Sequence, residues 1–347
     1  MKAAVYDGPG AVVVRDVPDP ACAPGGVVLE IEACGVCGVD LRTFRNGDHK
    51  IAPPRVLGHE CVGRVVESRA DGPGAPARGD RVAVYVPVPC GSCVYCRLGR
   101  ANLCDRRTTL AYQHDGALAR FMPIPAVSVR YGSLVPVRSD LAAPRLALAE
   151  PLGCVTNAHG RLRIGPADTV AVIGAGPIGI LHAVLARMEG AARVWLLDTS
   201  APRLELARGF GFDGTIVVRD RAHLDAMRDL TGGRGPTVVI VACGVATAQA
   251  DALEMAAKGG RVNFFGGLPK TAPLATLNAN FFHYKELEVS GSYSEKLEDF
   301  RRAVELVSDA RFPAERIVTH ELPLERMPEA FGLMESGAAL KVCIRPS

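Results

Sequence analysis

The stretch VAVIGAGPIGIL, residues 170–181, contains three glycines in the spacing G-x-G-x-x-G. A strand-like apolar run comes directly before these glycines, and a helix-like run with apolar periodicity follows them. In such a unit Gly174 permits a tight turn, Gly176 lets a pyrophosphate approach the backbone, and Gly179 lets helix and strand pack closely. The helix N-terminus offers free N–H groups and a positive dipole to the phosphates. The stretch therefore predicts a dinucleotide site.

The neighbouring sequence alternates between strand-like and helix-like runs. Helix-like sequences such as IGILHAVLARM separate the continuous apolar runs, which lie at 169–176, 192–198, 214–218, 236–243 and 260–266. Strands without polar alternation that are joined by helices are typical of a parallel sheet buried on both faces. We therefore expect residues 153–284 to form a doubly wound α/β domain.

An acidic residue ends the second apolar run. Asp198 stands 19 residues after Gly179, close to the separation of about 20 at which a carboxylate meets the adenosine ribose 2′-hydroxyl. A carboxylate at this point would repel a 2′-phosphate, whereas the nearby Arg203 would accommodate one. The pattern favours NAD over NADP.

The chain of 347 residues is longer than the roughly 250 to 300 residues at which one hydrophobic core stops growing. The first 150 residues contain short alternating runs such as VVLEIEA and VGRVVES, which predict a mainly β region. The final AALKVCIRPS is expected to return to this region as a strand. The predicted domains are therefore 1–152 with 285–347, and 153–284.

Charge and hydropathy exclude several classes of function. The 40 basic and 37 acidic residues are interspersed, so neither a nucleic acid nor a membrane surface is the expected partner. The N-terminus lacks the apolar segment of a signal peptide, and no apolar stretch is long enough to span a bilayer. We expect a cytoplasmic protein with a small-molecule substrate.

Eleven cysteines are many for a cytoplasmic chain, where clustered thiols more often hold metal than form disulfides. The spacing C-x2-C-x2-C-x7-C predicts a closed structural zinc site within a lobe at 88–106, with an iron–sulfur cluster as the chemical alternative. Its ligands would be Cys90, Cys93, Cys96 and Cys104.

A second set of possible ligands is scattered along the first region. Cys37 lies in ACGVCGVD, His59 and Glu60 in GHECVG, and Glu150 in EPLGC. Thiolate, imidazole and carboxylate form a credible mixed shell for a zinc ion that keeps one position open. A redox pair would need both cysteines of ACGVCGVD at one reactive turn, but Cys37 has better partners in His59 and the carboxylates, so we expect Cys34 to be a buried thiol.

With the motifs CGVCGVD, GHECVG, EPLGC, GAGPIG and LLDTSAPR and the four-cysteine lobe, the chain resembles the zinc-dependent medium-chain dehydrogenase/reductase family. It is most similar to the sorbitol (polyol) and threonine dehydrogenase branches. The resemblance implies a GroES-like, mainly β catalytic domain, an inserted Rossmann domain, and a homodimer or homotetramer. It implies two zinc ions per chain, one catalytic and one structural, and NAD as cofactor.

The resemblance also assigns residues one by one. It implies that Cys37 and His59 bind the catalytic zinc, and that Glu60 and Glu150 share the remaining coordination, without deciding which of the two binds directly. It implies contacts to the cofactor from Gly174, Gly176, Pro177, Ile178, Gly179, Asp198, Arg203, Phe265, Gly266, Gly267, Ser292 and Tyr293. The resemblance also places Ser294, the next residue in the chain, in contact with the substrate.

One departure from the relatives concerns the proton that leaves the substrate hydroxyl. Related enzymes have CGSD or CGTD, whose hydroxyl relays this proton, whereas Val39 stands here. Valine neither donates nor accepts, so the relay must use Thr43, which aligns with a position facing substrate, or His49, or water held by Glu60 or Glu150.

Two further departures concern the substrate. Arg42 and Phe44 replace the histidine and tyrosine typical of the threonine branch. Ser294 and Glu295 stand where the polyol branch has an Arg–Tyr pair, and a carboxylate beside the substrate suits an ammonium group. Glu295 also reads as the solvent-facing start of the helix EKLEDFRRAVELV.

The expected function is hydride transfer between NAD and a secondary alcohol of a polyol, cyclitol or aminocyclitol. The alternatives are an L-threonine or butane-2,3-diol dehydrogenase of the same type, a zinc-independent quinone or enoyl reductase, and a non-catalytic NAD-binding zinc protein.

Overall fold

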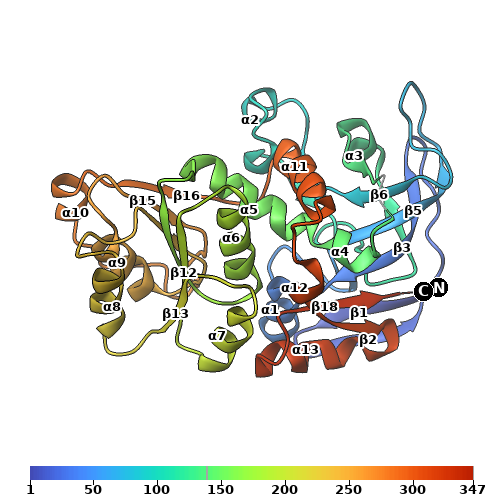
Figure 1. Cartoon of the computed structure of the whole chain (residues 1–347). Helices are drawn as coiled ribbons and strands as arrows, with labels where there is room; N and C mark the ends of the chain where they lie inside the picture. Colours follow the sequence, from blue (N-terminus) through green and yellow to red (C-terminus); the bar gives the residue numbers. More distant parts are fainter. Residues whose placement is uncertain (138–139, 347) are drawn as a thin grey trace. The chain divides into compact units, whose positions relative to one another are not determined.

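The computed structural model describes residues 1–137 and 140–346 (Figure 1). It divides into two compact units: Met1–Gly153 with the chain from Glu295 onward, and Cys154–Ser294. The expected return to the first unit at residue 285 is ten residues too early. Residues Glu288–Gly291 form a strand that pairs with Arg261–Phe264, and this pairing keeps them in the second unit.

The second unit is built on a parallel sheet with the strand order β13-β12-β11-β14-β15-β16. This is the order of a doubly wound dinucleotide-binding fold. Its central strands are almost continuously buried and apolar, which confirms the predicted parallel sheet. The strands are β11 (Thr169–Ile173), β12 (Arg193–Asp198), β13 (Gly214–Val217), β14 (Val238–Val241), β15 (Arg261–Phe264) and β16 (Glu288–Gly291).

Helices cover both faces of this sheet. In Figure 1, α6 and α7 lie on one side of the sheet and α8 and α9 on the other. The apolar faces of these helices pack on strands that need burial on both sides. The helices of the unit are α6 (Pro177–Met188), α7 (Ala201–Arg208), α8 (Ala222–Leu230), α9 (Ala246–Met255) and α10 (Asn280–Tyr284).

The first unit is mainly β, as predicted. Its largest sheet has the order β10-β6-β5-β3-β18-β17, with β9 also pairing with β3; β2-β1-β4 and β7-β8 form smaller sheets. The strands are β1 (Lys2–Gly8), β2 (Ala11–Asp16), β3 (Val27–Gly35), β4 (Arg55–Val56), β5 (Glu60–Ser68), β6 (Arg81–Val84), β7 (Pro87–Val88), β8 (Thr108–Thr109), β9 (Phe121–Ile124), β10 (Leu134–Pro136), β17 (Val318–Pro323) and β18 (Lys341–Arg345).

The C-terminal strand β18 enters this sheet between β17 and β3, antiparallel to β3. The last segment thus returns to the first region, as expected. Short helices connect the strands: α1 (Gly38–Asn46), α2 (Val94–Arg97), η1 (Ala101–Leu103), α3 (Ala126–Tyr131), α4 (Ala143–Ala147), α11 (Leu297–Ser308), α12 (Ala314–Ile317), η2 (Leu324–Arg326) and α13 (Met327–Ser336). Helix α5 (Ala149–Leu162) contains the division between the units.

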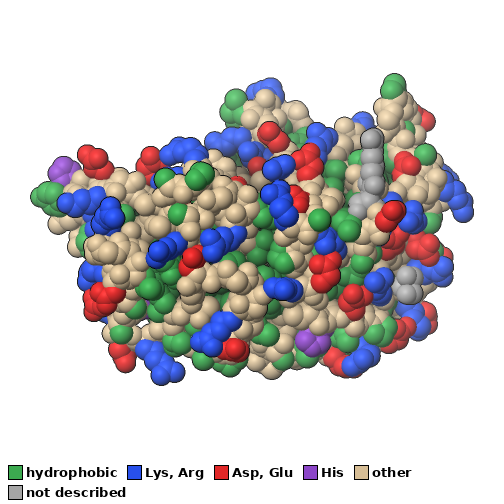
Figure 2. Space-filling view, in the orientation of Figure 1, with side chains coloured by type: hydrophobic (Ala, Val, Ile, Leu, Met, Phe, Trp, Pro, Cys, Tyr) green, Lys and Arg blue, Asp and Glu red, His purple; other side chains and the backbone are tan. Residues whose placement is uncertain are grey.

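The surface carries charges of both signs. On the face shown in Figure 2, basic and acidic side chains are intermingled, as the interspersed sequence pattern leads one to expect. In the part of the chain that the structure describes, no helix is long and apolar enough to cross a membrane.

Candidate active site

Three of the scattered residues meet at one end of the pair formed by β3 and β5. Cys37 caps α1 two residues after β3 ends, His59 precedes β5, and Glu60 is its first residue. The register pairs Gly35 with Glu60 across the two antiparallel strands, so both ends reach the same place. One ligand atom from each of Cys37, His59 and Glu60 lies within 4.8 Å of the others. The other thiol, Cys34, is fully buried and is not part of this group.

Negative charge surrounds the imidazole of His59. Asp40 is buried, and its Oδ2 accepts a hydrogen bond from the Cys37 N–H at 2.9 Å, which fixes the start of α1. Its Oδ1 lies 3.8 Å from His59 Nδ1. Burial by itself lowers the pKa of His59, but the charges of Cys37 and Asp40 raise this pKa well above its ordinary value. The negative charge that stabilises a proton on His59 would also stabilise a metal cation bound beside it.

Glu60 is held by a lysine from the far end of the chain. Lys341, at the start of β18, donates to both carboxylate oxygens of Glu60 at 2.7 Å, and both residues are buried. A Cβ on Gly35 would collide with the Glu60 carboxylate, so the strand can only pass this close without a side chain. The carboxylate keeps further lone pairs for a metal. The sequence prediction missed Lys341, whose signal is a single cation in the otherwise apolar run AALKVCI.

Glu150 lies in the first turn of α5, outside the 4.8 Å group formed by the other three ligands among the described residues. Burial raises the pKa of Glu150 to about 7; the positive charge of His59 opposes this rise, and the negative charge of Glu60 adds to it. Glu150 is therefore coupled electrostatically to the group.

The structure separates the candidates for proton relay. Thr43 is fully buried on α1, and its hydroxyl has no hydrogen-bond partner among the described residues. The His49 side chain is 60% exposed beside Asp48, as expected for a loop histidine. Val39 is half-buried two residues after Cys37.

Tyr112 is a second residue that the sequence prediction missed. Its ring meets the His59 ring edge to face, with 5.9 Å between the centroids. Burial, followed by the charges of Cys37 and Asp40, raises the pKa of Tyr112 above its ordinary value. The phenol thus stands in the field of the same group.

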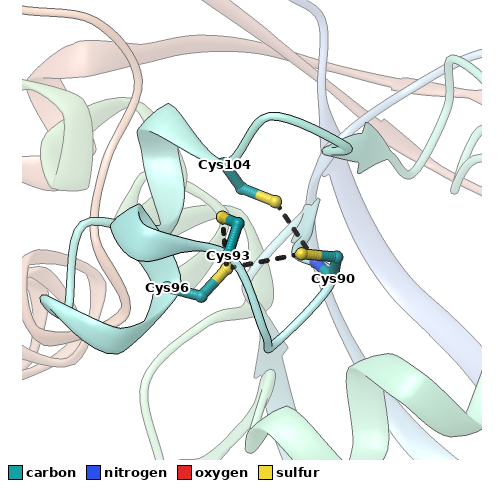
Figure 3. Close-up of side chains that lie close together, drawn as sticks. All are labelled: Cys90, Cys93, Cys96 and Cys104. Carbon is teal, nitrogen blue, oxygen red and sulfur yellow. Dashed lines mark hydrogen bonds between the residues drawn. The ribbon is translucent and has the colours of Figure 1, made fainter.

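The four cysteines of the lobe converge as their spacing predicts (Figure 3). Cys93 caps α2, Cys96 lies within it, Cys90 precedes it and Cys104 follows η1. The sulfur atoms of Cys93 and Cys96 are 3.5 Å apart, and those of Cys90 and Cys96 are 4.0 Å apart. Backbone N–H groups of Ser92 and Cys93 lower the pKa of Cys90 to about 5. This arrangement suits four-coordinate zinc.

The glycine loop of the second unit has the predicted local geometry. Gly174 follows β11 with φ +110°, and a Cβ on Gly179 would collide with the Gly174 carbonyl oxygen. A Cβ on Gly176 would meet nothing within 4 Å. Pro177 and Ile178 open α6. The loop therefore needs its first and third glycines for the fold, and its second glycine faces free space.

The acid at the end of β12 supports this loop directly. Asp198 accepts hydrogen bonds from the Ala175 N–H at 2.7 Å and from the Ser200 N–H at 2.8 Å. Arg203 lies half-buried in the first turn of α7, where its N–H is capped by Ser200.

The remaining predicted cofactor residues follow β15 and β16. Phe265 and Gly266 donate backbone hydrogen bonds to Val241 after β15, and Gly267 comes next in the chain. After β16, Ser292 donates to Asn263 at 3.1 Å, and Tyr293 is 53% exposed. Ser294 adopts a left-handed conformation with φ +54°, and its carbonyl oxygen accepts from Asn157.

Glu295 does not face solvent, so its interpretation as an exposed helix start is wrong. The residue is 0% exposed, and neither carboxyl oxygen has a hydrogen-bond partner among the described residues. A Cβ on Gly153, one turn after Glu150 on α5, would collide with this carboxyl group. Burial raises the pKa of Glu295 well above its ordinary value, and the charge of Glu150 adds to this effect.

Comparison with known proteins identifies the family. The profile described as zinc-binding dehydrogenase matches residues 177–309, and the profile described as alcohol dehydrogenase GroES-like domain matches residues 23–132. Sorbitol dehydrogenase of Halalkalibacterium halodurans is 32% identical over 100% of this chain and 99% of its own. L-threonine 3-dehydrogenase of Bacillus subtilis is 30% identical over the same shares.

A solved structure extends the similarity to the fold. A Sinorhizobium meliloti protein, assigned as a zinc-binding dehydrogenase and bound to NADP, superposes with a TM-score of 0.89 at 29% identity over 99% of both chains. Both predicted domain types are thereby confirmed. The chain belongs to the zinc-dependent medium-chain alcohol dehydrogenase family.

Proposed function

We propose that this chain is an NAD-dependent zinc dehydrogenase that oxidises a secondary alcohol of a polyol, a cyclitol or an amino-bearing cyclitol. The observation that carries the proposal is the convergence of Cys37, His59 and Glu60, whose ligand atoms lie within 4.8 Å of one another. Sorbitol and threonine dehydrogenases among the relatives support an alcohol beside further polar groups as the substrate.

The donor set fits a catalytic zinc ion. Sulfur, nitrogen and oxygen ligands together are common for zinc, and three protein ligands leave one position for substrate. The negative charge that raises the pKa of His59 would also stabilise the bound cation. We assign Glu60 to this shell and Glu150 to its edge, because only Glu60 belongs to the 4.8 Å group among the described residues.

The second unit fits a dinucleotide. The space around Gly176 admits a pyrophosphate at the N-terminus of α6. NAD is our proposal because the Asp198 carboxylate, which already accepts from two backbone N–H groups, would repel a 2′-phosphate. A solved relative carries NADP, so direct titration with both cofactors must decide.

When bound, zinc supplies a Lewis acid for the substrate oxygen, and NAD supplies the hydride acceptor. Cys37 and His59 would hold the ion, while Asp40 fixes the turn that carries Cys37. Lys341 holds the carboxylate of Glu60 in place. Glu150, whose pKa is raised to about 7, can accept the hydroxyl proton near neutral pH. The buried Thr43 hydroxyl is the other candidate for this transfer.

An amino-bearing substrate is supported by the sequence position of Glu295 more than by its surroundings. Its carboxyl group has no hydrogen-bond partner among the described residues, but it is also 0% exposed. The Glu295 carboxyl group packs against Gly153, which lies one turn after Glu150 on α5, so the charge of Glu150 acts on Glu295.

A second candidate is an L-threonine or butane-2,3-diol dehydrogenase, because a threonine dehydrogenase is among the relatives. Against it, Phe44 is stacked on Phe331 at 4.8 Å, and Arg42 is largely exposed beside Asp48. Neither position therefore carries the histidine or tyrosine that is typical of the threonine branch.

The test is an oxidation screen combined with metal analysis. Purified protein is assayed with NAD⁺ and NADP⁺ on sorbitol, xylitol, inositols, aminocyclitols, butane-2,3-diol and L-threonine, and its zinc content is measured. We expect two zinc ions per chain and NAD-linked oxidation of a polyol or cyclitol. Full activity without zinc would indicate a zinc-independent reductase, and zinc without any oxidation would indicate a binding protein.

A further inference from the structure

The candidate metal group contains few hydrogen-bond donors that a substrate can reach. Lys341 already donates to both oxygens of Glu60 and to the Val36 carbonyl oxygen. The Thr43 hydroxyl is enclosed, with 0% exposure. Asp40 and Glu150 accept hydrogen bonds when ionised and have none to donate.

Tyr112 differs from all of these residues. It is half-buried, with its ring against the first unit's core and edge to face with His59. Its backbone N–H is bonded to Thr109, but its hydroxyl has no hydrogen-bond partner among residues 1–137 and 140–346. A phenol ordinarily loses its proton near pH 10, so it both donates and accepts at neutral pH.

We infer that Tyr112 selects the substrate: its hydroxyl binds a hydroxyl group on the carbon next to the reacting carbon. The inference rests on the proposed function, because it requires that the alcohol oxygen binds beside His59. The contact between the rings of Tyr112 and His59 places the phenol beside the ligand group and not within it.

Vicinal diols match this arrangement. The second oxygen of a vicinal diol lies within hydrogen-bonding distance of the first, so a neutral donor beside the ligand group can reach it. A simple secondary alcohol has no such oxygen and leaves the phenol unused. Tyr112 should therefore favour polyols and cyclitols, whose hydroxyls are all vicinal, over monoalcohols.

The test is Tyr112→Phe, which removes the hydroxyl and keeps the ring on His59. Zinc-loaded wild type and variant are compared on butane-2,3-diol and butan-2-ol with saturating NAD⁺. Loss of one neutral hydrogen bond should lower kcat/KM for the diol about 2- to 12-fold, while the value for butan-2-ol stays unchanged. Tyr284→Phe, at a side chain that is 72% exposed, is the matched control and should change neither value.

A binding measurement separates this inference from the proposed function. Calorimetric titration of the zinc-loaded protein with erythritol should show a Kd about 2- to 12-fold higher in Tyr112→Phe, with unchanged zinc content and NAD affinity. An equal loss on both alcohols, or an unchanged erythritol Kd, overturns the role of Tyr112. Absence of turnover on every alcohol overturns the proposed function instead, and the erythritol titration still decides the role of Tyr112.

Discussion

Replacing Lys341 by Met should destabilise the first unit strongly in zinc-stripped protein. Lys341 is 5% exposed and Glu60 1%, and two hydrogen bonds of 2.7 Å join them. Removing one partner of a buried ion pair costs about 3–5 kcal/mol, because the other charge remains buried and unpaired. Methionine keeps the length of the side chain and its apolar contacts, so the loss reports the charge.

The matched control is Arg326→Met. Arg326 and Glu329 also form a close ion pair, but both side chains are more than half exposed, and solvent screening leaves such pairs with little effect on stability. The double variant Lys341→Met with Glu60→Gln removes both charges and should recover part of the loss. These three variants separate a buried charge from a general effect of losing a cation.

Urea denaturation followed by far-UV circular dichroism is the assay. Trp195, the chain's single tryptophan, lies in β12 of the second unit, so its fluorescence would miss the first. Burial lowers the pKa of Lys341, but Glu60 raises it above the ordinary value. The pair's stabilisation is therefore complete below about pH 10.4 and is lost as pH rises through the folded pKa. At pH 7, a loss no larger than that of Arg326→Met would refute the reasoning.

Three further predictions concern the other predicted residues. Gly179→Ala should destabilise the second unit by about 1–3 kcal/mol, because its Cβ meets the Gly174 carbonyl. Gly176→Ala should fold normally and bind NAD more weakly; circular dichroism and NAD titration distinguish the two, and a folding defect in Gly176→Ala would contradict this. In zinc-stripped protein, the raised pKa of Glu150, about 7, makes stability fall as pH rises from about 4 to 7. Glu150→Gln should flatten this slope, and an unchanged slope would contradict the burial argument. Thr43→Val should shift the pH–rate profile if the buried hydroxyl relays the proton, and an unchanged profile removes Thr43 from the mechanism.

Local patterns predicted the second unit well. The runs around VAVIGAG are strands because they are apolar throughout, and Gly174 and Gly179 are required by the turn itself. The boundary near residue 285 was less predictable. A strand-like run such as VSGSY does not indicate which sheet the strand joins, and β16 pairs with β15.

The sequence predicts those residues of the site whose side chains are common metal ligands. Cys37, His59 and Glu60 have metal-binding side chains, and the register of β3 with β5 then brings them together. Lys341 was missed because it lies 281 residues from its partner Glu60, and a lone lysine in a strand has many possible explanations.

The burial of Glu295 was hidden by a local pattern that points the other way. EKLEDF reads as the polar start of a helix, yet the Glu295 carboxyl packs against Gly153 on α5. Only the missing side chain at residue 153 makes this packing possible, and a glycine inside a helix gives no such signal on its own.

The central claim is that Cys37 holds a catalytic zinc distinct from the zinc of the four-cysteine lobe. The most direct measurement is zinc content per chain in wild type and Cys37→Ala, with turnover recorded on the same samples. We expect two ions in the wild type, one in Cys37→Ala, and a large loss of turnover with NAD affinity retained. Equal zinc content in both proteins, or near-normal turnover in Cys37→Ala, would contradict the claim.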